Sequence, residues 1–430
     1  MKTTARKFIA GCLLAGLAAA LAACGAGLLG NQGRLRLLNA TAAFGALDLF
    51  ANNDPVAGGI APYTASDYQF RKDDTYTLDI RQTGNAATLA TTTATLTADN
   101  FQTAVAYTNG GAMAVTVLDD NEGSPGKGQA KFRVFNTSTA APDQVDVYLV
   151  TAACNTLTSS PAAPTAAGVS GLQAAYAQLA SSGTPYFLCV TGAGDKSDLR
   201  LEIPSFVLSE KRIVTVILAR GAGGYLLNAI ILDQQGAATL ALNESARVRA
   251  ATSVPTPVDV AVNGTPIAAG LGSPNVGPYT LVPAGPIAVN VNGAAVAPVA
   301  PLTAAPGADV TILLTGSTPT VTLLPDDNTP SASTARPVKL RLVNGLNGTT
   351  ASATLTLNNV LVGTSTPPAT ASDYTLVASS AGLARLEARV GALQFYFDPA
   401  GTLETGRVYS LFLLGDGTVS ANLGILVPDR

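Results

Sequence analysis

The segment Leu35-Arg36-Leu37-Leu38-Asn39, followed after a short gap by Leu47-Asp48-Leu49-Phe50, decides the fold because the chain contains four versions of it. The arginine of the first part recurs at intervals of 97, 116 and 92 residues. Self-similarity at a nearly constant period is typical of tandem repeats, so the sequence predicts four copies of one structural unit. The later copies of the two parts are residues 132–136 with 145–148, 248–252 with 258–260, and 340–344 with 353–355.

Two further landmarks keep the same phase. A tyrosine follows the start of the second part by 21 residues in three copies, at Tyr68, Tyr279 and Tyr374. In the second copy we expect Tyr186 in this place, 41 residues after the start, which indicates an insertion. Each copy also ends in an apolar run that meets an aspartate, and these aspartates are Asp119, Asp233, Asp326 and Asp429.

The residues inside each copy predict strands rather than helices. Leu78 and Ile80 alternate with polar residues, the period of a half-buried strand, and turn signals such as Asn109-Gly110-Gly111 separate the apolar runs. About seven short strands in each copy fit an immunoglobulin-like antiparallel sandwich. The fold class is therefore all-β, and residues 169–179, in the insertion, are the best helix candidate. The predicted repeats are 33–126, 127–243, 244–335 and 336–430, after a signal peptide at 1–23 and a linker at 24–32.

These motifs also carry a family resemblance. Arg-Val/Leu-x-Asn, a short gap and Val-Asp-Val-Tyr together resemble the bacterial domain of unknown function 4397. The first two copies match best, whereas the third has Thr252 in place of the asparagine and the fourth has Thr354 in place of the aspartate. The resemblance covers nearly all of residues 33–430 and implies tandem domains on secreted or lipid-anchored envelope proteins, with no known activity.

Composition excludes several classes of function. Hydrophobic residues make up 47% of the 430 and charged residues 12%, which is incompatible with an intrinsically disordered chain. The formal charge of −3 provides no electrostatic attraction for nucleic acid. The absence of histidine removes catalytic triads and histidine-ligated metals together, so we expect no enzyme, no catalytic residues and no cofactor. A hydrolase of unknown type is the third-ranked class.

The N-terminus predicts export and lipidation. Lys2, Arg6 and Lys7 form a basic region before an apolar stretch, and small residues then lead to Cys24. This pattern resembles the lipobox of bacterial lipoproteins, in which the new N-terminal cysteine is acylated. Two or three acyl chains anchor a protein firmly to a membrane. An uncleaved helical anchor and an ordinary signal peptide are the alternatives, and the resemblance favours the outer membrane because Gly25 follows the cysteine.

Two cysteines remain once the N-terminal pair is set aside. An even pair in an exported chain predicts a disulfide between Cys154 and Cys189, the alternative being two buried thiols. Such a bond would close a loop of about 35 residues and contribute roughly 3–4 kcal/mol. It would pin the insertion of the second repeat.

Recurring charges provide the other candidate sites. If the first two strands of a repeat are neighbours, three arginine–aspartate pairs would lie across them as structural charge pairs, the alternative being arginines that bind a carboxylate ligand. The predicted pairs are Arg36 with Asp48, Arg133 with Asp146, and Arg249 with Asp259.

Acidic residues at the repeat junctions are weak calcium candidates, because Ca²⁺ prefers carboxylate and amide oxygens. The alternative is a solvated linker in which these residues form turns. The residues concerned are Asp119, Asp120, Asp326 and Asp327.

The sequence thus predicts a lipid-anchored array of four sandwich domains in the cell envelope. A structural or adhesive role, with loops presented to a protein or glycan partner, is the first hypothesis. A periplasmic binding or scaffolding lipoprotein, for an envelope complex or a polysaccharide, is the second. The membrane would be contacted through the N-terminal lipid alone.

Overall fold

The computed structural model describes residues 31–430 except 110, 139–142, 174, 298–300, 332–335 and 419–422. Cys24 and the predicted signal peptide lie outside the described residues. Nearly all described elements are strands, and the helical exception is the 3₁₀ helix η2 (Cys154–Ser159). No helix in the described part of the chain is long and apolar enough to cross a membrane.

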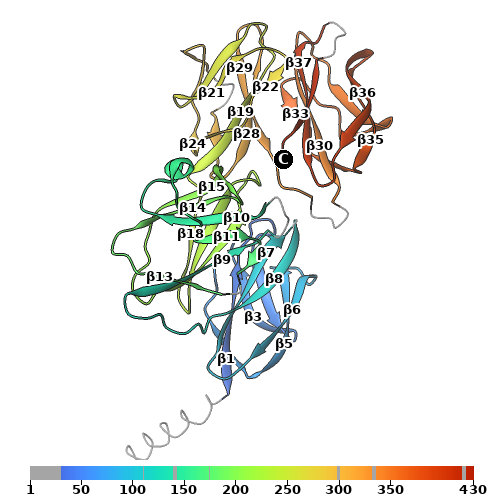
Figure 1. The fold of residues 1–430 in the computed structure, drawn as a ribbon. Coiled ribbons are helices and arrows are strands. Elements are labelled where there is room, and N and C mark those ends of the chain that lie inside the picture. Colours follow the sequence, from blue (N-terminus) through green and yellow to red (C-terminus); the bar gives the residue numbers. More distant parts are fainter. Residues whose placement is uncertain are drawn as a thin grey trace, which may run out of the picture. The chain divides into compact units, whose positions relative to one another are not determined.

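Every sheet draws its strands from one of the four predicted repeats, here called repeats 1 to 4 (Figure 1). In repeat 1 the strands are β1 (Gln32–Asn39), β2 (Leu47–Ala51), β3 (Asp54–Ile60), β4 (Gln69–Lys72), β5 (Asp74–Gln82), β6 (Thr88–Leu96), β7 (Phe101–Asn109) and β8 (Ala112–Asp119). They form two sheets, with the orders β4-β1-β7-β8 and β3-β2-β5-β6.

Repeat 2 contains the η2 insertion. Its strands are β9 (Gln129–Asn136), β10 (Val145–Val150), β11 (Ala166–Val169), β12 (Gly171–Leu172), β13 (Ala177–Ala180), β14 (Tyr186–Gly192), β15 (Asp195–Phe206), β16 (Ile213–Arg220), β17 (Leu227–Asp233) and β18 (Ala238–Ala241). The sheets are β12-β9-β16-β17-β18, with β13 also on β9, and β11-β10-β14-β15. The expected helix over 169–179 is wrong, because this stretch supplies β12 and β13, which pair with β9.

Repeat 3 is rich in short strands. They are β19 (Ser245–Thr252), β20 (Val258–Val262), β21 (Thr265–Leu271), β22 (Asn275–Val276), β23 (Thr280–Pro283), β24 (Gly285–Pro286), β25 (Val289–Val291), β26 (Ala294–Ala295), β27 (Thr303–Ala304), β28 (Asp309–Thr315) and β29 (Thr320–Asp326). They form the sheets β22-β19-β28-β29, with β23 also on β19, β21-β20-β25-β26 and the small pair β24-β27.

Repeat 4 has the same plan with longer strands. These are β30 (Val338–Asn347), β31 (Ala353–Leu357), β32 (Val360–Leu361), β33 (Thr370–Ala371), β34 (Thr375–Val377), β35 (Ser380–Val390), β36 (Leu393–Leu403), β37 (Val408–Asp416) and β38 (Gly424–Pro428). The sheets are β33-β30-β37-β38, with β34 also on β30, and β32-β31-β35-β36.

One parallel pair recurs in each otherwise antiparallel sandwich. The first strand of every repeat, β1, β9, β19 or β30, runs parallel to β7, β16, β28 or β37 respectively. We call the sheet with this pair the first sheet, and the sheet that contains the second strand the second sheet. In β2 the residues Leu47, Leu49 and Ala51 point into the core while Asp48 and Phe50 are half-buried, which is the alternation that the sequence predicts.

The chain divides into two compact units. Unit 1 holds the described residues up to Tyr107 together with Ala114–Gly123 and Gln234–Ala237. Unit 2 holds Thr108–Met113, Ser124–Asp233 and Ala238–Arg430, and so combines nearly all of repeats 2, 3 and 4. Each of these three repeats also has its own apolar core, formed between its two sheets.

Candidate functional site

The arginine of each first strand is held by the strand that runs parallel to it. The register places each arginine directly beside a hydroxyl residue, namely Thr103, Thr215, Thr311 or Ser410. The arginine Nε donates to that hydroxyl at 2.8 to 2.9 Å in all four repeats. The arginines, Arg36, Arg133, Arg249 and Arg341, are all buried.

A tyrosine ring covers each of these guanidinium groups. The distance from the arginine Cζ to the ring centre is 4.3 Å for Tyr68, 4.3 Å for Tyr176, 4.5 Å for Tyr279 and 4.6 Å for Tyr374. Such cation–π contacts are strongest where water is excluded. The prediction that Tyr186 takes this place in repeat 2 is wrong, because Tyr186 begins β14 of the second sheet. Tyr176 takes the role instead, just before β13.

An aspartate completes the arrangement in repeats 1, 3 and 4. Asp326 accepts hydrogen bonds from the hydroxyls of Tyr279 at 2.6 Å and Thr311 at 2.7 Å. Asp120 accepts in the same way from Tyr68 and Thr103, and Asp429 from Tyr374 and Ser410. In repeat 2 the corresponding register position is Gln234, two residues after Leu232, the partner of Thr215. We call each set of arginine, tyrosine, hydroxyl residue and acid the arginine cluster of its repeat.

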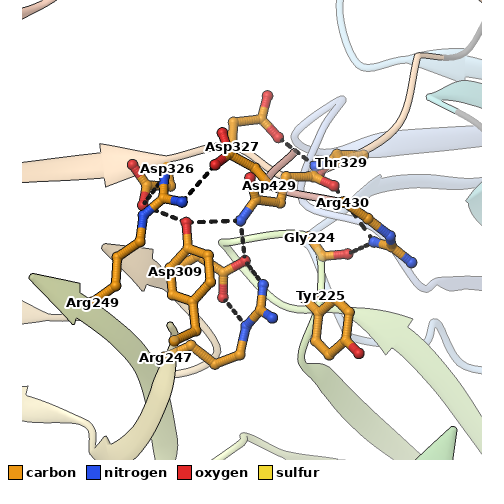
Figure 2. A network of polar contacts seen from close by, with 12 residues as sticks. Gly224, Tyr225, Arg247, Arg249, Asp309, Asp326, Asp327, Thr329, Asp429 and Arg430 are labelled. Atoms are coloured by element: carbon orange, nitrogen blue, oxygen red, sulfur yellow. Dashed lines mark hydrogen bonds and ion pairs between the residues drawn. The ribbon is translucent and has the colours of Figure 1, made fainter. Parts of the chain in front are cut away.

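Ion pairs between their arginine clusters join repeats 3 and 4. Nη1 of Arg249 in repeat 3 lies 2.6 Å from Oδ1 of Asp429 in repeat 4. Arg341 of repeat 4 binds Asp326 of repeat 3 in return, and Nη2 of Arg249 also lies 3.6 Å from Asp326. The four side chains expose 2% or less of their surface. The contact is reciprocal, because the arginine of each repeat forms an ion pair with the aspartate of the other. Figure 2 shows Arg249 beside Asp326, with Asp429 nearby.

Apolar residues beside these ion pairs join the two repeats. Ala251, Leu313 and Leu324 of repeat 3 form one buried cluster with Val343, Phe412 and Leu414 of repeat 4. All lie on first-sheet strands, so the first sheets face each other here. Exclusion of water by these residues strengthens the ion pairs, because charges interact more strongly where the local dielectric is low.

Repeat 2 joins the same junction through the turn between β16 and β17. The amide of Gly223 donates to the carbonyl of Gly307 at 2.9 Å, and the carbonyl of Gly223 accepts from Asn328 N at 2.9 Å. Arg430 donates to the carbonyl of Gly224 (Figure 2). It also forms an ion pair with Asp143 of repeat 2.

A second arginine of repeat 3 lies in the same contact. Arg247 forms a two-point ion pair with Asp309 and lies 3.7 Å over the ring of Tyr225, a repeat 2 residue. Repeats 2, 3 and 4 therefore meet at one buried, highly charged junction.

Burial and charge act in opposite directions at the centre of this junction. Burial alone would raise the pKa of Asp326, but the nearby charges of Arg341 and Arg249 outweigh it and hold that pKa below the ordinary value. Burial raises the pKa of Tyr279 well above its ordinary value, so its hydroxyl remains a donor. Burial lowers the pKa of Arg430 to about 10.

The predicted charge pairs between the first and second strands are wrong. Arg36 lies in one sheet and Asp48 in the other, because β1 pairs with β4 and β7 whereas β2 pairs with β3 and β5. In repeats 2 and 3 the first and second strands also lie in different sheets. Arg133 therefore does not pair with Asp146, and Arg249 does not pair with Asp259. Arg249 and Arg341 do bind carboxylates, but these belong to the neighbouring repeat.

The aspartates of the second strands have a structural role instead. Oδ1 of Asp48 accepts from the amide of Gly59 at 2.7 Å, where the register of β2 and β3 is irregular. Gly59 has a φ of 68°, a conformation that favours glycine. Asp146 binds Gly168, and Asp259 binds Gly270, in the same geometry. The recurring aspartate therefore fixes a β-bulge.

The calcium hypothesis is not supported by the surroundings of its residues. Arg341 and Arg249 neutralise Asp326, and Nζ of Lys339 lies 2.6 Å from Asp327. Asp120 is buried against Tyr68 and Thr103, whereas Asp119 is exposed. Across the described residues, no group of three or more Asp, Glu, His or Cys is arranged to hold a metal ion. The solvated-linker alternative is also wrong for Asp326, which is buried.

The disulfide prediction is confirmed. Cys154 and Cys189 are bonded, and the bond ties η2 to β14. Beside it lies an open pocket of about 300 Å³, lined by residues that include Leu149, Thr151, Leu157 and Ser160. Nζ of Lys196 donates to the carbonyls of Ser160 and Ala162 at 2.7 and 2.8 Å and holds the insertion in place.

Sequence reasoning missed the arginine cluster, although it found the arginine, tyrosine and aspartate of repeats 3 and 4. In repeat 1 the acid is Asp120 and not Asp119, and in repeat 2 Asp233 does not take this place. The arginine, the tyrosine and the terminal aspartate each mark the phase of the repeats, but nothing local links them. The hydroxyl residue gives no such signal, since it varies between threonine and serine. The one available signal was that all these landmarks share the same period.

Each repeat combines the two-part motif, two sheets and the arginine cluster, and this unit can be compared with known protein families. A family model for the domain of unknown function DUF4397 matches residues 33–148 and 246–351, together just over half of the chain. The chain belongs to the DUF4397 family. Each match begins at the first strand of a repeat and continues into the following repeat, so the matched regions start with repeats 1 and 3. No curated protein matches the chain.

Proposed function

We propose that this DUF4397 protein is a non-enzymatic, lipid-anchored structural or adhesive protein of the cell envelope. The buried junction of unit 2 carries the proposal, because ion pairs among Arg249, Asp326, Arg341 and Asp429 join repeats 3 and 4, and the turn at Gly223 joins repeat 2 to them. A joined array of sandwiches suits a protein that holds loops at a distance from its anchor. Cys24 would supply that anchor, at the outer membrane, and the loops would meet a protein or glycan partner.

The disulfide-pinned insertion favours a second candidate function. Its pocket of about 300 Å³ lies in repeat 2 beside the Cys154–Cys189 bond, and Lys196 holds the segment that lines it. Concave sites of this size occur at small-ligand and peptide sites. In this alternative the chain is a periplasmic binding or scaffolding lipoprotein for an envelope complex or a polysaccharide.

The lipid anchor is tested by Cys24→Ser, with Cys12→Ser as the matched control in the same N-terminal segment. Cells that express either variant or the parent chain are labelled with a palmitate analogue and fractionated. Loss of label and of membrane association in Cys24→Ser alone supports the anchor. Unchanged label and fractionation of Cys24→Ser would refute it.

Exposure at the cell surface separates the two functions. Intact cells are treated with protease and probed for repeat 4, with lysed cells as the control. Cleavage in intact cells supports the structural or adhesive role, and reduced adhesion in a deletion strain would extend it. Complete protection until lysis would overturn the surface role and favour the periplasmic alternative.

A further inference from the structure

The outer edge of β6 in repeat 1 lacks the protection that the other repeats give the same strand. β6 ends the second sheet, and its nine residues, Thr-Leu-Ala-Thr-Thr-Thr-Ala-Thr-Leu, contain no charge and no proline. It pairs with β5 in unbroken register from Asp74–Leu96 to Ile80–Ala90. A long, regular, uncharged edge strand is a template for pairing with another strand.

The corresponding edges of repeats 2, 3 and 4 serve as internal comparisons. β15 carries charges, Pro204 and three register shifts, and β26 has only two residues. β36 contains Asp398 and Pro399 and is also bulged against β35. Charges, prolines, bulges and short length are the usual means by which proteins block edge pairing. The repeat 1 member of this set of four is long and has no charge and no proline, and its one register shift lies at its start, between Thr88 and Ala90.

The exposed side of β6 is a row of threonines. Thr91, Thr93 and Thr95 are exposed, whereas Ala94 and Leu96 point into the core. Within the described residues, one hydrogen bond from a side chain reaches the β6 backbone, from Nε2 of Gln102 to the carbonyl of Thr95 at 3.1 Å. It marks one end of the free edge, which leaves residues 90–94 available for pairing.

The sequence of this free edge is self-complementary. Ala90-Thr91-Thr92-Thr93-Ala94 reads the same in both directions around Thr92. In an antiparallel pair of two identical strands centred on Thr92, Thr91 lies opposite Thr93 and Ala90 opposite Ala94. Each threonine thus meets a threonine, a favourable cross-strand pair, on the same face of the joined sheet.

We propose that β6 pairs with β6 of a second copy of this chain, antiparallel and about a two-fold axis at Thr92. The two second sheets of repeat 1 then become one continuous sheet, and neither edge is left open. A two-fold dimer uses the same surface on both partners, as the symmetric sequence requires. The inference depends on repeat 1 alone and not on the proposed function.

Cysteine crosslinking tests both the pairing and its register. The full chain is prepared as Thr91→Cys and as Thr93→Cys, with the parent chain as the control for crosslinks through its own cysteines. Directly opposite residues lie within disulfide reach, whereas diagonal ones are mostly too far apart. Under mild oxidation we expect a dimer in the equal mixture of both variants and little in either variant alone. Crosslinking of either variant with itself, or none in the mixture, would overturn the proposed register.

Charge placed on the edge tests the interaction without an added bond. In Thr91→Lys/Thr93→Lys each lysine faces a lysine of the partner, and like charges directly opposite destabilise a sheet. Thr75→Lys/Thr77→Lys is the matched control. These two exposed residues of β5 lie directly opposite Thr95 and Thr93 of β6, so the same charges are placed one strand inside the edge.

Analytical ultracentrifugation over a concentration series should show that the average mass of the parent and of the control rises with concentration from that of a monomer toward that of a dimer. The edge variant should dimerise at least about tenfold more weakly, with an unchanged circular dichroism spectrum. A parent chain that stays monomeric throughout, or equal dimerisation of both variants, refutes the proposal. Capture of an extended peptide of another protein by a monomeric parent chain would assign the edge to that partner instead.

Discussion

At the scale of single residues, Asp326 is a fully buried carboxylate at the centre of the junction in unit 2. Its side chain has no exposed surface, lies between Arg249 and Arg341, and accepts from the hydroxyls of Tyr279 and Thr311. Buried ion pairs do not always stabilise a protein, but the removal of one partner leaves an uncompensated charge in the interior. The loss of Asp326 would leave Arg341 without its ion-pair partner and Arg249 with Asp429 alone.

We therefore expect Asp326→Asn to lower the free energy of unfolding of unit 2 by about 3–5 kcal/mol. Denaturant titration followed by circular dichroism provides the measurement. Asp373→Asn is the control, because Asp373 is exposed. A difference below that of the control would show that the ion pairs of Asp326 contribute nothing.

The same variant has a defined pH dependence. The folded pKa of Asp326 lies below its ordinary value, so its stabilising contribution is complete above the unfolded pKa, about 3.9, and is lost as the pH falls through the folded pKa. Asp309, whose pKa is raised by burial, acts in the opposite direction in both proteins. The stability gap between parent and Asp326→Asn should consequently narrow as the pH falls below about 4.

Tyr279→Phe removes one hydroxyl, with its two hydrogen bonds, from the junction. The Tyr279 hydroxyl donates to Asp326 at 2.6 Å and accepts from Asn328 Nδ2 at 3.2 Å. We expect a loss of about 1–3 kcal/mol from unit 2, as for hydrogen bonds to charged groups. Tyr68→Phe removes the equivalent bond to Asp120 and should destabilise unit 1 only. Equal effects of both variants on one shared transition would contradict this assignment.

At the scale of elements, the insertion of repeat 2 is ordered by a covalent bond more than by its own packing. η2 has no side-chain cap, and Cys154 and Leu157 are its buried residues. The disulfide joins it to β14, and Lys196 holds the loop that follows. A disulfide stabilises such a segment mainly by restricting its unfolded states.

Cys154→Ser/Cys189→Ser should accordingly lower the stability of unit 2 by about 3–4 kcal/mol and open the insertion to protease between residues 151 and 165. Limited proteolysis with mass spectrometry locates the cuts. The parent chain treated with a reductant should give the same cuts, whereas Lys196→Met should loosen the loop with a smaller loss of stability. Resistance of the double variant to protease would show that the insertion is ordered without the bond.

At the scale of the whole molecule, unit 2 depends on close approach between repeats at glycine. A Cβ atom added at Gly223 would lie 2.5 Å from Cγ of Asp309, and also too close to the amide of Asp309. The same turn exchanges backbone hydrogen bonds with Gly307 and Asn328. Glycine is therefore required here by a neighbouring backbone rather than by its own φ angle.

Gly223→Ala should separate repeat 2 from repeats 3 and 4 while each sandwich stays folded. Calorimetry is expected to show the unit 2 transition splitting in two, at a cost of about 1–3 kcal/mol. Small-angle scattering should report a larger radius of gyration. Gly183→Ala is the control, because Gly183 lies in an exposed turn and its added Cβ meets nothing within 4 Å. A single unchanged transition would mean that this contact does not hold the repeats together.

The sequence by itself determined the repeat number, the all-β class and the Cys154–Cys189 bond, since periodicity, turn residues and an even pair of cysteines are local or countable features. Only the tertiary structure decided what the recurring charges do. Arg36 and Asp48 are close in sequence but belong to opposite sheets, while Arg249 and Asp429, 180 residues apart, are in contact. Strand order and the docking of whole repeats set these distances. Both depend on packing between segments remote in the chain, which no local pattern encodes.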